Sequence, residues 1–189
     1  SYATLASKSL KTEKGLSEKV KTFILYMSPS TEAGINTCAM AGNCADVCIN
    51  TSGNMVYTTS KIARIKRTLR WHLFPDAFFH DLACELNIHK EQCALEGYTP
   101  AVRLNGTSDI LWERTGIIDQ FPELQFYDYT KFESHQRKVP SNYHLTYSLS
   151  EKEGSWVQAM KWLDDGRNVA VVVRGKAQAR FAVSVGAWR

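Results

Sequence analysis

The alternation of strand-like and helix-like segments is the feature that most constrains the fold of this chain. Short runs rich in apolar, β-branched and aromatic residues recur at 21–27, 101–104, 124–129, 143–149 and 168–173. Helical patterns or polar links separate them, and short β–α–β connections favour right-handed crossovers and a parallel sheet. The run Val169–Val173 is wholly apolar, as expected of a strand covered on both faces. The sequence therefore predicts an α/β fold, either a partial (β/α) barrel or an open, mostly parallel sheet of five to six strands, the sixth at 180–185.

Four stretches carry helical patterns. In residues 59–73 one side is apolar (Ile62, Ile65, Leu69, Leu73) and the other basic (Lys61, Arg64, Arg67, Arg70). Pro75 interrupts this pattern, and Asp76 is the predicted cap of a second helix. A short helix is expected over 112–121, and another over 155–163 with Ser155 as its cap.

Length and composition indicate a single domain. The 189 residues are 44% hydrophobic, which suffices for one core, so we expect one α/β domain over 1–189. Residues 1–20 are predicted to be a flexible N-terminal segment, and residues 187–189 resemble the start of an affinity tag. No apolar run approaches the roughly 20 residues of a membrane-spanning helix, so we expect a cytoplasmic protein without membrane contact. The net charge of +4 permits an anionic partner.

Three of the five cysteines, Cys38, Cys44 and Cys48, fall within one long loop after the first predicted strand. In a cytoplasmic protein such clustering favours metal ligation over disulfides. Three thiolates can hold three irons of a [4Fe–4S] cluster, or three positions around a tetrahedral zinc ion. The alternative is that they are unrelated free thiols. Packing in a helix is expected for Cys84 and Cys93.

Polar residues follow the other predicted strands at their carboxyl ends. In parallel α/β folds the loops at this edge build the functional site, so we expect the cysteine loop and the loops 105–109, 130–132 and 148–151 to converge there. The candidate ligand-binding residues are Asn105, Gly106, Thr107, Ser108, Asp109, Lys131 and Ser148. Ser108 and Asp109 equally suit turn and helix-cap chemistry, and a lone lysine such as Lys131 is more often solvated. The expected ligand is a small molecule or a nucleotide.

The basic helix offers a different hypothesis. Lys61, Arg64, Arg67 and Arg70 can follow a phosphate backbone, with Trp71 and Tyr57 near enough to stack on bases. A solvated helix face explains the same residues equally well. The histidines show no order typical of a hydrolase or deaminase, and the chain has no phosphate-binding Walker loop or dinucleotide fingerprint.

A cysteine triplet directly after the first strand, followed by the polar turn Gly106-Thr107-Ser108-Asp109 after the second, resembles the radical S-adenosylmethionine superfamily. The resemblance implies that Cys38, Cys44 and Cys48 hold a [4Fe–4S] cluster, and that the turn contacts the amino group of S-adenosylmethionine. The spacing Cys-x5-Cys-x3-Cys differs from the Cys-x3-Cys-x2-Cys usual there, and no Gly-Gly-Glu follows the second strand.

More narrowly, three segments resemble a bacteriophage family, the gene-product-eighty-eight type. They are 34–38 with Cys44 and Cys48, Asn105–Asp109, and Phe126-Tyr127-Asp128-Tyr129-Thr130-Lys131, and the resemblance spans roughly residues 22 to 175. It implies phage origin and a host-cytoplasmic location. We therefore expect a phage iron–sulfur protein resembling radical S-adenosylmethionine enzymes. The alternatives are a metal-stabilised nucleic-acid-binding phage protein and a structural phage protein with reduced cysteines.

Overall fold

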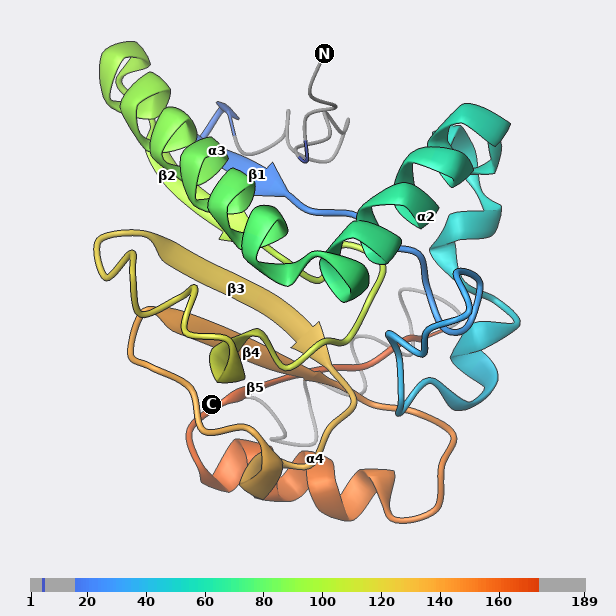
Figure 1. Ribbon diagram of the computed structural model, residues 1–189. Helices are drawn as coiled ribbons and strands as arrows, with labels where there is room; N and C mark the ends of the chain where they lie inside the picture. Colours follow the sequence, from blue (N-terminus) through green and yellow to red (C-terminus); the bar gives the residue numbers. More distant parts are fainter. Residues whose placement is uncertain (1–4, 6–15, 174–189) are drawn as a thin grey trace.

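The computed structural model describes Leu5 and residues 16–173, and its framework is one parallel sheet. Five strands lie in the order β1-β2-β3-β4-β5, each parallel to its neighbours (Figure 1). Their bounds are β1 Val20–Ile24, β2 Thr99–Arg103, β3 Gln125–Thr130, β4 Tyr143–Ser148 and β5 Asn168–Ala170. The sheet is open, which confirms the predicted α/β fold with an open parallel sheet. The sixth strand at 180–185, the end at 187–189 and most of the N-terminal segment lie outside the described residues.

The two faces of the sheet differ because side chains alternate along each strand. In β3, Phe126, Asp128 and Thr130 are buried, while Gln125 and Tyr129 are exposed. One face of the sheet packs on the core. No described helix covers the opposite face, which is called the open face here, although Ile24 and Ala101 on it are also buried. The expectation that residues 169–173 are covered on both sides is wrong, because Val169 is 5% exposed but Val172 is 92% exposed. Among the described strands, β5 pairs only with β4.

Three helices are described: α2 Thr58–Leu73, α3 Pro75–Glu96 and α4 Ser155–Asp164. Pro75 separates α2 from α3, as predicted, but it occupies the first turn of α3, where its missing N–H costs nothing, and Asp76 is not the cap. Gly154, not Ser155, precedes α4 as its N-cap residue. The buried positions of α3 recur at helical spacing and pack on the core face of the sheet: Phe78, Leu82, Leu86, His89 and Cys93.

Short 3₁₀ segments complete the described structure: η1 Gly42–Ala45, η2 Ile49–Thr51, η3 Gly53–Val56, η4 Trp112–Arg114 and η5 Ser134–Gln136. The helix expected over 112–121 is therefore reduced to η4. Gly116 adopts a positive φ of 75°, which ends any right-handed helix there. Trp112, Ile117 and Ile118 instead fill the core from an irregular segment.

The burial of α2 does not follow the division into an apolar and a basic side: Arg64 on the basic side is buried, and Ile65 and Leu69 on the apolar side are only half-buried. The buried residues of α2 are Arg64 and Thr68, while Ile62 is 46% and Leu73 is 59% exposed. Arg67 and Thr68 face inward because the chain after β1 needs hydrogen-bond partners there. Thr68 Oγ1 accepts from the Ser28 N–H at 2.8 Å, and Arg67 donates to the Tyr26 carbonyl at 3.1 Å. Backbone polar groups buried away from water require such partners.

Within residue 5 and residues 16–173, no helix combines the length and the apolar character needed to cross a membrane.

Candidate functional site

A cavity of about 480 Å³ lies at the carboxyl ends of the strands. Figure 1 shows the loop after β1, with η1 to η3, at the end of the sheet to which the strand arrows point. The cavity is lined by this loop, by residues 105–109 after β2, by Tyr129–Lys131 at the end of β3 and by Ser148 at the end of β4. Every residue predicted as a metal ligand or as a cofactor contact therefore lies in the wall of the same cavity.

All three loop cysteines contribute to this wall as free thiols. Cys44 is exposed in η1, and Cys38 and Cys48 are half-buried on either side of it. The Sγ atom of Cys38 lies 3.7 Å from the Thr107 carbonyl oxygen, and burial raises the pKa of this thiol. Cys84 and Cys93 lie on α3 and do not line the cavity. Cys93 is buried, as expected of a packed cysteine, whereas Cys84 is exposed.

The cysteine loop is fastened at two points. At its start, Thr37 donates its hydroxyl to the Ser28 carbonyl at 2.6 Å, and its own carbonyl accepts from the Asp109 N–H at 2.9 Å. Beyond Cys38, the Asn43 N–H donates to Glu151 Oε1 at 2.8 Å, which joins the loop to the segment between β4 and α4. The loop is therefore connected to two other walls of the cavity.

Asn105 organises the loop after β2. Its Oδ1 accepts from the Ser108 hydroxyl at 2.8 Å, the Ile110 N–H at 2.9 Å and the Trp112 indole N–H at 2.9 Å. Its Nδ2 donates to the Ile110 carbonyl at 3.0 Å. Thr107 donates its hydroxyl to the Met27 carbonyl. The side chains of Asn105, Thr107 and Ser108 thus hold the cavity wall in shape through internal hydrogen bonds.

Asp109 ends this loop in a buried ionic network. Its carboxylate accepts from the Lys131 N–H at 2.8 Å and pairs with Arg137 Nη1 at 3.2 Å. Arg137 is fully buried, and its Nε lies 2.6 Å from Glu113 Oε1. Burial raises the pKa of Asp109, while the Lys131 N–H and the Arg137 guanidinium oppose that rise. Asp109 therefore anchors the end of β3 to the loop after β2.

Asp128 forms a second buried anchor beneath the cavity. It accepts from the N–H groups of Leu104 at 3.2 Å and Asn105 at 2.9 Å, and from the Tyr143 hydroxyl at 3.1 Å. Arg103 Nε lies 3.6 Å away. Burial raises the pKa of Asp128 to about 7, with the Arg103 guanidinium the strongest opposing influence.

The chain matches the family model described as Gene product 88 over residues 3–187. It belongs to the Gene product 88 family. This is a phage gene-product family, as the sequence resemblance predicted. Neither the curated proteins nor the solved structures contain a match to the chain.

In this Gene product 88 family member, the cations predicted to follow a phosphate backbone make internal contacts. Arg64 is 2% exposed and donates to the Met55 carbonyl at 3.2 Å. Arg67 donates to Tyr26, as described above, Arg70 pairs with Asp81 at 2.5 Å, and Lys61 lies 3.3 Å from Glu32. The basic side of α2 is therefore engaged mainly in holding the helix against the rest of the protein.

Sequence reasoning missed Arg103, Asp128 and Arg137. A signal for Asp128 exists, because it is the charged residue at a core-facing position of an alternating strand, between Phe126 and Thr130. Arg103 stands at the end of a strand that precedes a candidate loop. Arg137 lies in an irregular segment, where no sequence periodicity separates a buried arginine from a solvated one.

Proposed function

We propose that this Gene product 88 family member is an iron–sulfur protein of the host cytoplasm that resembles radical S-adenosylmethionine enzymes. Its substrate is a small molecule or a nucleotide. The supporting observation is that Cys38, Cys44 and Cys48 share one cavity of about 480 Å³ with residues 105–109, Lys131 and Ser148. The cavity lies at the carboxyl edge of a parallel sheet, where sites of α/β proteins are built.

The type of ligand supports an iron–sulfur cluster. Three free thiols on a single loop supply the ligand type that such clusters require. In the described residues no group of three or more His, Cys, Asp and Glu side chains lies together so as to hold a metal ion. The proposal therefore requires the cysteine loop to draw its thiols together on metal binding, which also removes their protons.

A cluster with one open iron would chelate the methionine part of S-adenosylmethionine and supply one electron. The protein's own residues have the tasks of holding and orienting. Asn105 fixes the cavity wall formed by residues 105–109, and the Asp109–Arg137 pair keeps that wall attached to the segment after β3. The small side chains of Ala41 and Ala45, which line the same cavity, leave room between the thiols.

Anaerobic purification followed by iron and sulfide analysis and an absorption spectrum tests the proposal. We expect brown protein with about four irons per chain, since each cluster of this type holds four. Cys38→Ala, Cys44→Ala and Cys48→Ala should each lose most of the iron. Cys84→Ala is the matched control, because Cys84 is an exposed thiol outside the cavity.

Colourless, iron-free protein, or equal iron in all four variants, would overturn the proposal. Zinc in place of iron would replace it with the metal-stabilised alternative. A nucleic-acid-binding role through α2 has less support, because its arginines are occupied by Met55, Tyr26 and Asp81.

A further inference from the structure

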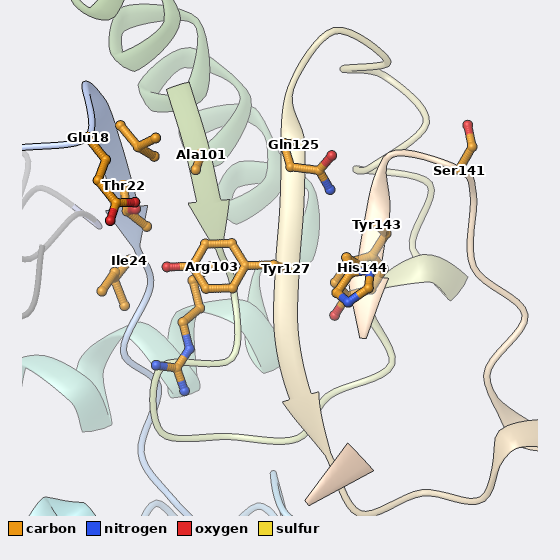
Figure 2. A pocket seen from close by; sticks show the side chains of 11 residues that line it. Glu18, Thr22, Ile24, Ala101, Arg103, Gln125, Tyr127, Ser141, Tyr143 and His144 are labelled. Carbon is orange, nitrogen blue, oxygen red and sulfur yellow. The ribbon is translucent and has the colours of Figure 1, made fainter. Parts of the chain in front are cut away.

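A second cavity, of about 620 Å³, lies on the open face of the sheet. Figure 2 looks onto this face and shows the lining side chains standing on β1, β2, β3 and β4. Ile24 and Ala101 are apolar and buried, and Gln125 and His144 are exposed polar residues. The cavity thus combines an apolar floor with hydrogen-bonding groups, and its volume is within the range of small-molecule sites.

Aromatic rings form a platform on this face. Tyr127 and Tyr129 are two residues apart in β3 and therefore point to the same side of the sheet. Figure 2 shows the Tyr127 ring face-on, extending from β3 toward the end of β2. Tyr129 is 45% exposed, and the Arg103 guanidinium lies over its ring, 5.3 Å from the centroid. Exposed aromatic faces beside an arginine are the arrangement on which nucleobases stack.

Arg103 joins the two cavities, because it lines both of them. Figure 2 shows its guanidinium extending toward the carboxyl ends of the strands. Its Nε faces Asp128 at 3.6 Å and is buried without a hydrogen-bond partner among the described residues. Lys131, on the wall of the cysteine cavity, makes no ion pair with a described residue. Arg103 therefore lies at the boundary between the cavities, and Lys131 lies within the cysteine cavity.

Two carboxylates offset part of this positive charge: Asp128 lies 3.6 Å from Arg103 Nε, and Glu151 interacts electrostatically with Lys131. The other anionic side chains near the cavities are paired elsewhere or lie at the amino ends of the strands. Asp109 is paired with Arg137, and Glu32 accepts from the Ser28 hydroxyl and lies near Lys61. Glu18 lines the open-face cavity before β1, at the amino ends of the strands and so away from the guanidinium. An anionic group is therefore favoured near Arg103 and Lys131.

We propose that the open face binds a nucleoside 5′-monophosphate. Its base stacks on Tyr127 over the floor formed by Ile24 and Ala101, and its phosphate binds Arg103 and Lys131. The phosphate end then faces the cavity that carries the cysteines. The statement that this nucleotide is the substrate rests on the proposed function. Binding of the nucleotide to the open face needs no metal.

Isothermal titration with the four ribonucleoside 5′-monophosphates tests the proposal, with adenosine, inorganic phosphate and a thymidine octanucleotide as comparison probes. At least one monophosphate should bind with a dissociation constant in the millimolar range or lower. Tyr127→Ala should weaken it about five- to a hundredfold, because a stacked base contributes that much. Tyr127→Phe keeps the ring and should retain binding. Tyr57→Ala removes a tyrosine that is 60% exposed outside both cavities and should change nothing.

Lys131→Ala should weaken the monophosphate about tenfold and leave adenosine unaffected. Arg103→Gln should also weaken the monophosphate about tenfold and leave adenosine unaffected. If Arg103→Gln unfolds because Asp128 loses its partner, Lys131→Ala still tests the phosphate contact. Failure of every monophosphate, binding of the octanucleotide alone, or equal affinity of Tyr127→Ala would overturn the proposal. Iron content, measured on the same samples, separates this outcome from failure of the iron–sulfur proposal: iron without nucleotide binding rejects only the nucleotide site.

Discussion

Replacing Asn105 with alanine tests how the candidate site is held together. The substitution removes the shared acceptor of three donors. The Ser108 hydroxyl can rotate toward another acceptor, but the buried Ile110 N–H and Trp112 indole N–H are fixed and lose their partner. Each buried unsatisfied donor costs about 1–3 kcal/mol, so Asn105→Ala should lower the free energy of unfolding by about 2–6 kcal/mol. This is a large part of the roughly 5–15 kcal/mol that stabilises a typical domain.

Urea unfolding followed by circular dichroism measures this loss. Asn87→Ala is the control, because Asn87 is exposed on α3 and donates only to the Ala83 carbonyl, so its change should stay within about 0.5 kcal/mol. In a Trp112→Phe background the indole N–H is absent, and Asn105→Ala should cost about 1–3 kcal/mol less. If Asn105→Ala matched the wild-type free energy within about 0.5 kcal/mol, Asn105 would not be the organising residue.

Three further predictions concern the buried groups around the cavity. Gly106→Ala should cost about 1–3 kcal/mol in thermal unfolding, because its Cβ would lie 2.8 Å from the Leu25 carbonyl oxygen; unchanged melting would contradict this. Arg137→Met should lower the free energy of unfolding by about 3–5 kcal/mol, because the buried carboxylates of Asp109 and Glu113 lose their cationic partner. A urea midpoint equal to that of the wild type would show that the network is not needed for stability. Asp128 has a pKa of about 7 in the folded protein, against about 3.9 in the unfolded chain. The stability that this difference contributes is fully present below about pH 4 and should be lost as the pH rises through about 7. The free energy of unfolding should fall by up to about 1.4 kcal/mol per pH unit in that range. Asp128→Asn should remove that slope from urea midpoints measured across this range, and identical slopes would refute it.

The sequence by itself determined the parallel α/β framework and the edge at which the candidate site lies. Both follow from local patterns, because strand and helix periodicities are visible in the chain and parallel strands bring their carboxyl ends together. For the same reason Cys38, Asn105 and Lys131 could be assigned to one cavity without knowledge of any contact.

Only the tertiary structure decided which groups are buried and what they bind. Arg67 and Thr68 of α2 turn inward because the backbone groups of Tyr26 and Ser28 need hydrogen-bond partners. The spacing of apolar residues in the sequence gives no information about this need. Arg137 is buried because Asp109 and Glu113, distant in sequence, meet around it. The open face with Tyr127 and Arg103 exists because the described helices pack on the other face of the sheet, and the order of amino acids within a strand does not reveal which face stays uncovered.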